Sequence, residues 1–215
     1  MGRDVQRRPS PPVIGLTGGA GSGKSAVAAL FRRRGARVVD ADRLGHRLLR
    51  RGSPCHEKIV ATFGEGVRSR GGAVDRGKLG ALVFGDKREL AKLNSIVHPE
   101  LLKNIKRQIS RFRKTKSGPV VVEAALLVDW GLHREMDRTI VVEAPLRLRL
   151  ERLAKRGVPL ARARAVIASQ LPAGRLRRAA DEVLDNSGTP AELGRAAARA
   201  WSRIEKMVEK RGRLR

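Results

Sequence analysis

The stretch VIGLTGGAGSGKS, residues 13–25, decides the fold of this chain. Its first part, Val13 to Thr17, has the apolar composition of a buried strand. Its second part, Gly18 to Ser25, fits the phosphate-binding loop pattern G-x-x-x-x-G-K-[ST], which requires a strand before it and a helix after it. Residues 25–34 have the composition of that helix. The stretch therefore predicts the strand, loop and helix that bind a nucleoside triphosphate.

The residue types in the loop match the chemistry of phosphate binding. Glycines let the backbone turn closely, so that successive N–H groups converge on phosphate oxygens. The positive end of the following helix adds to the same anion site. Lys24 is expected to reach the β and γ phosphates, and the Ser25 hydroxyl to hold Mg²⁺. The alternative is a glycine-rich turn with a capping serine, which the flanking strand and helix disfavour.

Length and composition indicate one domain over residues 13–210, with flexible tails at 1–12 and 211–215. No apolar run approaches the ~18 residues that span a bilayer, and the first dozen residues lack the apolar part of a secretory signal. We therefore expect a cytoplasmic protein with no membrane partner. The single cysteine, Cys55, excludes an internal disulfide and argues against a thiolate metal cluster.

The formal net charge of +26 allows two interpretations. A basic surface can neutralise the backbone of a nucleic acid. Alternatively, the charges cover solvated helix faces and steer small polyanions toward the protein. The basic residues are dispersed over the whole chain, and four Phe, two Trp and no Tyr leave little for bases to stack on. We favour the second interpretation and expect no specific nucleic-acid partner.

Strands and helices alternate along the chain, which predicts an α/β fold with a doubly wound parallel sheet. Apolar runs indicate further strands at 36–40, 119–123, 138–143 and 182–184. The segment 43–117 is mostly amphipathic, with helices expected at 43–51, 56–63, 76–84, 87–96 and 99–116 and no central strand. So much helix between two strands predicts an inserted subdomain that covers an acceptor substrate.

The second half of the chain contains an arginine-rich helical segment at 146–180, with breaks expected at Gly157, Pro159 and 172–174. Such a segment is placed to act as a lid over bound nucleotide. A final helix is expected over residues 190–210.

Two carboxylates, Asp40 and Asp42, follow the second predicted strand. The carboxyl ends of parallel strands face the ligand crevice, so both are expected beside the phosphate loop. A kinase that acts on an alcohol benefits from a carboxylate that accepts the hydroxyl proton, and Asp42 is the candidate. Either residue could instead cap the helix that follows.

The chain resembles the dephospho-coenzyme A kinase family in six segments, in order. They are IGLTGGAGSGKS at 14–25, VVDAD at 38–42, KLNSIVHP at 92–99, VVVEAALLVDWGL at 120–132, RLERLAKRG at 149–157 and ADEVLDNSG at 180–188. The loop alone is shared with many nucleotide hydrolases and kinases, whereas the combination is specific to the family. Relatives usually carry proline at the position of Ala125, glutamate at Asp129, and acidic and lysine residues within 174–176.

The resemblance implies a phosphate-loop kinase core of the nucleoside-monophosphate-kinase type, with a helical acceptor-binding subdomain and a helical lid. It implies transfer of a phosphoryl group from ATP to the ribose 3′-hydroxyl of dephospho-coenzyme A, with Mg²⁺, as the last step of coenzyme A biosynthesis. The catalytic residues implied are Asp42, Lys24 and Arg156. The implied ATP-binding residues are Gly19, Ala20, Gly21, Ser22, Gly23, Lys24, Ser25, Arg152 and Asn186.

Several roles stay open at this point. Asn186 follows the last strand, where relatives place the adenine, but it also suits a turn. His98, with Asp42, is assigned to the acceptor, although a packing histidine before a helix-starting proline is favoured. Glu123 either meets Mg²⁺ through water or closes a strand. The rival functions are a nucleic-acid-stimulated nucleotide hydrolase, suggested by the charge, and a kinase for another nucleoside or small alcohol.

Overall fold

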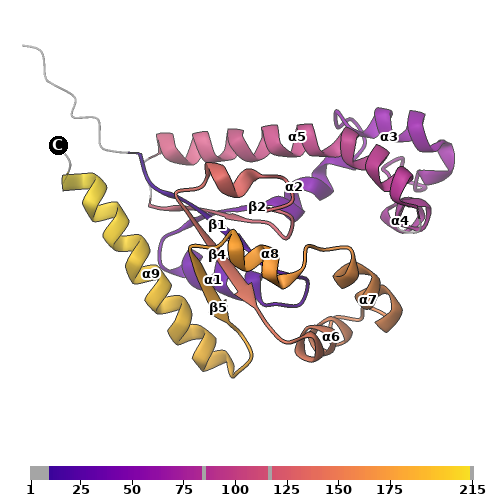
Figure 1. Ribbon diagram of the computed structural model, residues 1–215. Coiled ribbons are helices and arrows are strands. Elements are labelled where there is room, and N and C mark those ends of the chain that lie inside the picture. The colour runs from indigo at the N-terminus through magenta and orange to yellow at the C-terminus, as the bar shows by residue number, and fades with distance from the viewer. Residues whose placement is uncertain (1–9, 84–85, 116–117, 214–215) are drawn as a thin grey trace, which may run out of the picture. The chain divides into compact units, whose positions relative to one another are not determined.

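The structure, a computed structural model, describes residues 10–83, 86–115 and 118–213 (Figure 1). The chain divides into two compact units, which we call the core unit (residues 1–39 and 109–215) and the helical unit (residues 40–108). Parts of the expected tails, 1–9 and 214–215, lie outside the described residues, as do residues 84 and 116 of two expected helices.

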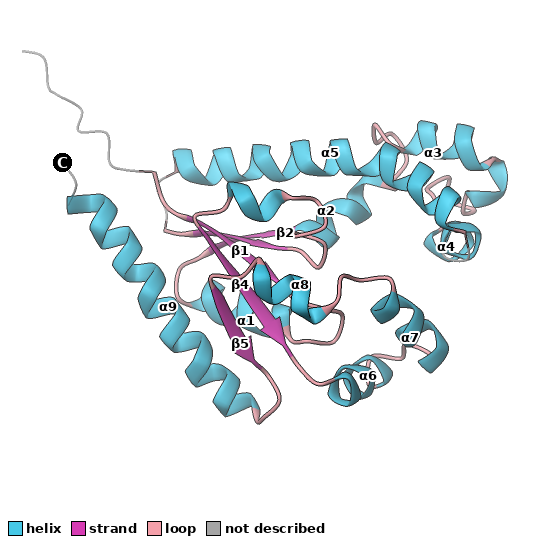
Figure 2. Cartoon of the chain, viewed as in Figure 1, coloured by secondary structure: helices cyan, strands magenta, loops and turns pink. Residues whose placement is uncertain are grey.

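The core unit is built on a five-stranded sheet with the order β2-β3-β1-β4-β5 (Figure 2). The strands are β1 (Val13–Thr17), β2 (Arg37–Asp40), β3 (Val120–Glu123), β4 (Arg138–Glu143) and β5 (Glu182–Asp185). β1 pairs in parallel with β3 and β4, and β4 pairs in parallel with β5. All five residues of β1 are buried, as expected for a central strand covered on both faces. The predicted parallel α/β sheet is confirmed.

Two helices that are far apart in sequence share the core of this unit. α1 (Lys24–Arg33) and α9 (Pro190–Arg213) pack against each other and contact the sheet. The rings of Phe31 on α1 and Trp201 on α9 lie 5.6 Å apart between centroids, at an angle of 39°. Both side chains are buried within one cluster that also contains residues of β1, β3, β4 and β5. This apolar contact fixes the last helix to the first.

The predicted lid consists of α6 (Leu146–Ala154), α7 (Leu160–Ala168) and α8 (Ala173–Arg178), between β4 and β5. Pro159 and Pro172 directly precede α7 and α8, as the helix-breaking residues predict. The predicted break at 172–174 is too long, because residues 173 and 174 already belong to α8. Proline is well suited to the start of a helix, so the break ends at Pro172 and α8 begins at once.

The helical unit contains α2 (Ala41–Leu48), α3 (His56–Phe63), the 3₁₀ turn η1 (Glu65–Val67), α4 (Arg76–Val83) and most of α5 (Lys87–Lys114). Within the described part of this stretch, strand pairing is limited to a single antiparallel bridge between Arg68 and Val74. The expectation of a helical insertion without a central strand is therefore confirmed.

Helix α5 corrects one prediction. Two helices with a break before Pro99 were expected, whereas α5 runs through Pro99 without interruption. Proline removes one backbone donor from a helix interior, but tertiary packing of the helix can outweigh this loss. The buried side chains of Leu101, Ile105 and Ile109 continue the apolar face of the helix beyond the proline.

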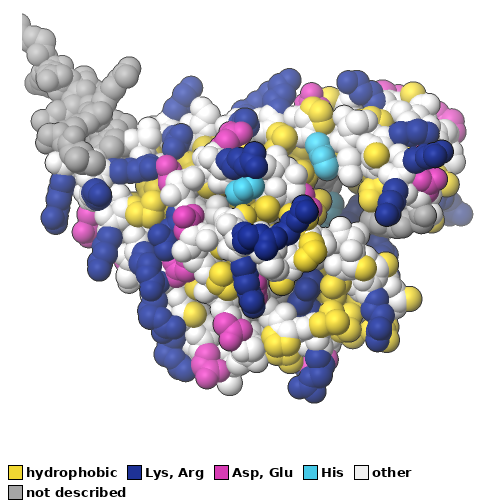
Figure 3. Space-filling model, in the orientation of Figure 1, with side chains coloured by type: hydrophobic (Ala, Val, Ile, Leu, Met, Phe, Trp, Pro, Cys, Tyr) yellow, Lys and Arg dark blue, Asp and Glu magenta, His cyan; other side chains and the backbone are white. Residues whose placement is uncertain are grey.

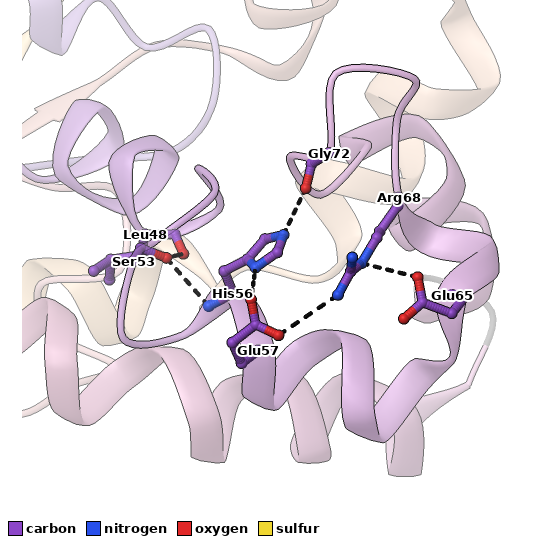
Figure 4. Close-up of polar contacts among 7 residues, drawn as sticks. All are labelled: Leu48, Ser53, His56, Glu57, Glu65, Arg68 and Gly72. Atoms are coloured by element: carbon purple, nitrogen blue, oxygen red, sulfur yellow. Dashed lines mark hydrogen bonds and ion pairs between the residues drawn. The ribbon is translucent and has the colours of Figure 1, made fainter.

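A buried histidine organises the loops of the helical unit (Figure 4). His56 is 1% exposed. Its Nε2 lies 2.7 Å from the carbonyl oxygen of Gly72, and its Nδ1 lies 2.7 Å from Glu57 Oε1. Arg68 bridges Glu57 and Glu65, at 3.5 and 2.9 Å. These contacts connect the start of α3 to the loop that leads to α4.

Parts of the expected tails belong to the fold. Pro11 and Pro12 are buried, and the Pro12 carbonyl accepts a 2.9 Å hydrogen bond from the Val120 backbone N–H. At the other end, α9 continues to residue 213, and Arg211 Nη2 lies 2.6 Å from Asp137 Oδ1. A backbone hydrogen bond to Val120 therefore fixes residues 11–12, and an ion pair fixes Arg211, although composition alone indicated flexible tails. Among the described helices, none combines the length and apolar character needed to cross a membrane.

Candidate active site

The glycine-rich loop connects the end of β1 to the start of α1. Gly23 precedes the helix in the left-handed conformation, with φ 105° and ψ 12°. A side chain at Gly18 would overlap the backbone carbonyl of Val142 on β4. Gly23 is therefore required because of its backbone conformation, and Gly18 because a side chain would not fit beside Val142. The result is a compact loop at the carboxyl end of the central strand, as the sequence predicts.

Lys24 places a positive charge against this loop. Its Nζ donates hydrogen bonds to the carbonyl oxygens of Gly18, at 2.7 Å, and Gly19, at 3.2 Å. The residue is only 8% exposed. Lys24 is also the first residue of α1, so its ammonium group and the positive end of the helix act on the same region. This arrangement favours the binding of a phosphate group.

Ser25 and Glu123 bring two oxygen ligands together. The Ser25 hydroxyl donates a 2.6 Å hydrogen bond to Glu123 Oε1, at the end of β3. Glu123 thus ends β3 and also contacts the start of α1, and its role toward Mg²⁺ stays a prediction. Among the described residues, no group of three or more His, Cys, Asp or Glu side chains could hold a metal. A hydroxyl and one carboxylate nevertheless fit Mg²⁺, which in kinases takes few protein ligands and completes its shell with phosphates and water.

Arg152 and Asn186, both predicted as nucleotide ligands, meet at the loop. Arg152 Nη2 donates to the Asn186 backbone carbonyl, at 2.9 Å, and to Asn186 Oδ1, at 3.3 Å. Arg152 Nη1 lies 3.4 Å from the Gly21 carbonyl oxygen. Asn186 Nδ2 donates a 2.7 Å bond to the Ser22 carbonyl. The Asn186 amide thus ties the end of β5 to the loop, and recognition of an adenine stays a prediction.

Arg156, the other predicted lid arginine, lies beyond the end of α6 and is exposed. Its side chain forms no hydrogen bond or ion pair within the part of the chain that the structure describes. The structure thus brings Arg152 to the phosphate loop and leaves Arg156 away from these contacts.

Two residues that the sequence reasoning missed also bind the loop. Arg149 Nε donates to the Ala20 carbonyl oxygen, and the Ala20 N–H donates to Gln170 Oε1. Burial lowers the pKa of the Arg149 guanidinium, which still remains charged at neutral pH. The spacing of Arg149 and Arg152, three residues apart on α6, places them on one helix face and was the available signal.

A cavity of about 620 Å³ lies against the loop. Gly19, Ser22 and Arg149 line its loop end, and mostly apolar side chains line the rest. Arg177 and Glu143 also line the cavity and form a bidentate ion pair, with distances of 2.6 to 2.9 Å between the guanidinium nitrogens and the carboxylate oxygens. The volume lies in the range of small-molecule pockets in proteins. The remaining lining residues include Val142, Ala144, Pro145, Leu171, Ala173, Leu176, Val183, Asp185 and Ser187.

The two carboxylates after β2 have different positions at the start of α2. Asp40 is the N-cap, because its Oδ1 accepts a 2.8 Å hydrogen bond from the Arg43 N–H. Asp42 lies in the first turn of the helix and is exposed. Capping is therefore the role of Asp40, and the role of Asp42 as a base stays a prediction.

The helical unit contains His98, which was predicted to bind the acceptor, and His46, which lies near Asp42 on α2. His98 is half-buried in the interior of α5 and precedes Pro99, which does not start a helix as expected. His46 follows Asp42 by one turn on α2. Burial, and to a lesser extent Arg76, lower the pKa of His46 despite the opposing effect of Asp42. His46 is therefore neutral at neutral pH.

Comparisons with known proteins give a consistent picture. A family model described as dephospho-CoA kinase matches residues 12–192. The dephospho-CoA kinase of Thermobifida fusca is 39% identical over 200 residues, which cover 92% of this chain and 98% of the relative. The dephospho-CoA kinase of Bacillus licheniformis is 42% identical over 200 residues, covering 90% and 98%.

Solved structures show the same fold. The crystal structure of TT1252 from Thermus thermophilus has a TM-score of 0.75 and 35% identity, and the match covers 90% of this chain and 98% of that one. The dephospho-CoA kinase from Campylobacter jejuni has a TM-score of 0.62 with 23% identity, covering 90% and 97%. The second similarity supports the fold alone.

Proposed function

Because the chain belongs to the dephospho-CoA kinase family, we propose that it transfers the γ-phosphoryl group of ATP to the ribose 3′-hydroxyl of dephospho-coenzyme A. The products are coenzyme A and ADP. The observation that carries the proposal is the hydrogen bond between Ser25 and Glu123 at the loop whose Gly18 carbonyl binds the Lys24 ammonium. A phosphate loop, a lysine and a pair of hard oxygen ligands are the parts that a phosphoryl-transfer site requires.

The loop and α1 bind the phosphates of the donor. Backbone N–H groups of the loop that are not bonded within the protein, together with the start of α1, are proposed to bind the β and γ phosphates, and Lys24 supplies a positive charge. Ser25 and Glu123 would hold Mg²⁺, Glu123 through water. Such an ion would supply positive charge against the phosphates of ATP.

Asp42 accepts the proton of the acceptor hydroxyl. A carboxylate near the acceptor can accept the hydroxyl proton as the oxygen attacks phosphorus. Because Asp40 caps α2, Asp42 is not needed for that task. His98 contributes to the binding of the acceptor from α5.

Arginines of the lid stabilise the transferring group. Arg152 already contacts the loop through Gly21, and Arg156 is proposed to approach as the lid closes. Guanidinium groups stabilise the charge that spreads over the phosphoryl oxygens in the transition state.

The dispersed basic surface suits polyanionic small substrates. Lys and Arg side chains are spread over the whole face shown in Figure 3, with a row of them on its left side. Such a surface raises the rate at which ATP and dephospho-coenzyme A, both highly negative, reach the protein. It does not require a nucleic-acid partner.

A coupled ADP-release assay tests the function directly. ATP and Mg²⁺ are supplied with dephospho-coenzyme A, with adenosine monophosphate, or with no acceptor, and coenzyme A is detected by mass. We expect turnover with the first acceptor alone and formation of coenzyme A. Hydrolysis that needs no acceptor and is stimulated by RNA or DNA at physiological salt would favour the nucleotide-hydrolase alternative.

A further inference from the structure

The peptide group of Ala20, at the tip of the phosphate loop, is held from both sides by side chains of the lid. Its N–H donates a 2.8 Å hydrogen bond to Gln170 Oε1. Its carbonyl oxygen accepts a 2.9 Å bond from Arg149 Nε. Arg149 Nη2 lies 3.2 Å from the same Gln170 oxygen. The three contacts form a closed ring, which we call the Ala20 clamp.

The two side chains of the clamp come from different parts of the lid. Arg149 lies in the first turn of α6, and Gln170 lies in the connection between α7 and α8. They are 129 and 150 residues from Ala20 in sequence. The clamp therefore connects two separate parts of the lid to the phosphate loop.

The neighbouring glycines indicate how closely Arg149 approaches the loop. A side chain at Gly19 would overlap the Arg149 guanidinium, and one at Gly21 would lie 2.5 Å from the Arg149 carbonyl oxygen. Two glycines of the loop thus provide the space that Arg149 occupies. The lost hydration of Arg149, seen in its lowered pKa, is offset by bonds to the loop and to Gln170.

We propose that Arg149 and Gln170 are positioning residues, which hold the tip of the phosphate loop in its nucleotide-binding conformation and thereby set the affinity for ATP. This role rests on the proposed function of the loop. The two residues act through the Ala20 backbone and do not touch the reacting atoms. A loop that is fixed before binding loses less conformational freedom when the phosphates arrive, and this raises affinity.

Four variants test the clamp. Gln170→Met keeps the length of the side chain and removes the shared acceptor, and Arg149→Ala removes both donors. Arg149→Lys keeps the charge but cannot make the two-pronged contact. Arg147→Ala is the matched control, because Arg147 is on the same helix, has an 84% exposed side chain, and pairs only with Glu151 at 3.6 Å among the described residues. It removes the same charge from α6 without touching the loop.

The primary readout is the dissociation constant for ATP and ADP, measured by titration calorimetry without any acceptor. We expect Gln170→Met, Arg149→Ala and Arg149→Lys to raise it roughly 5- to 20-fold, with Arg147→Ala close to wild type. In the coupled assay KM for ATP should rise while kcat changes less than about threefold. The double variant of Arg149 and Gln170 should lose no more nucleotide affinity than the weaker-binding single variant, because the contacts act as one unit.

Two results would overturn the proposal. One is nucleotide affinity in Gln170→Met and Arg149→Ala equal to that of Arg147→Ala, with circular dichroism showing that the variants are folded. The other is a loss confined to kcat, which would mean that the residues contact the reacting groups. Because the affinity measurement needs no acceptor, the clamp can be confirmed even if the chain fails to phosphorylate dephospho-coenzyme A.

Discussion

The Ser25 hydroxyl and the Glu123 carboxylate are joined by a hydrogen bond of 2.6 Å. The bond joins the start of α1 to the end of β3, and it follows from the parallel register in which Leu16 of β1 pairs with Glu123. Neighbouring parallel strands end at the same edge of a sheet, so the loop after one strand meets the last side chain of the next. This relationship underlies the expected Mg²⁺ site.

Replacing Glu123 by Gln should weaken the use of Mg²⁺. The amide keeps the shape of the side chain but loses the negative charge. We therefore expect Mg²⁺ affinity or activity to fall roughly 10- to 100-fold, as it does when residues that orient metal ligands are replaced. Turnover measured against Mg²⁺ concentration checks this. Glu151→Gln, on the exposed side of α6, is the control. Equal Mg²⁺ dependence in both variants would contradict the assignment.

Substitutions of Asp40 and Asp42 should have different effects, one on stability and the other on catalysis. Asp42→Ala is expected to lower kcat by roughly 10²- to 10⁴-fold while the protein unfolds at the same temperature. Asp40→Ala removes the N-cap of α2 and should cost about 1 kcal/mol of stability. Thermal unfolding and turnover are measured on both variants. Unchanged turnover in Asp42→Ala would remove its role as the base.

Asn186→Ala should destabilise the phosphate loop. The change leaves the buried Ser22 carbonyl and the Arg152 guanidinium without their amide partner, which costs about 1–3 kcal/mol. Chemical unfolding measures the loss, and Asn104→Ala, which removes the hydrogen bond from the Asn104 side chain to the Glu100 carbonyl within α5, is the comparison. Asn186→Asp should be impaired as well, because its oxygen replaces the donor to Ser22. Full stability in Asn186→Asp would show that this donor is unimportant.

Cys55 should react slowly with alkylating reagents in the native protein. The thiol is fully buried, and burial together with Glu100 raises its pKa. A raised pKa means less thiolate at a given pH, so the rate at pH 8 should be at least roughly tenfold below that of a free cysteine and should increase toward higher pH. Labelling followed by mass spectrometry, in buffer and in denaturant, gives the comparison. Equal rates in the two conditions would refute burial of the thiol.

Local patterns were sufficient for the central elements of the fold. The strand at Val13–Thr17 and the loop after it depend on an apolar run and a glycine-rich pattern, both read within a few residues. The strand at Arg138–Glu143 was predicted with the same limits for the same reason. Pro99 misled the prediction of α5, because the packing that carries a helix through a proline is not visible in the neighbouring residues.

The parts of the site that were missed depend on contacts between distant segments. In an arginine-rich chain, composition alone does not distinguish Arg149, which binds the loop, from Arg147, which is exposed. Gln170 carries no charge and lies in a connection, so no periodicity marks it. The contacts of both residues with the loop exist because the fold brings 149 and 170 beside residue 20.

The contact between Trp201 and Phe31 gives the protein an intrinsic optical probe. The chain has no tyrosine and two tryptophans, Trp130 and Trp201, and both lie outside residues 40–108. Its ultraviolet emission therefore reports on the core unit, whereas the helical unit contributes strongly to far-ultraviolet dichroism but emits nothing from tryptophan. Melting curves recorded by the two signals would coincide if both units unfold together and would separate if the helical unit opens first.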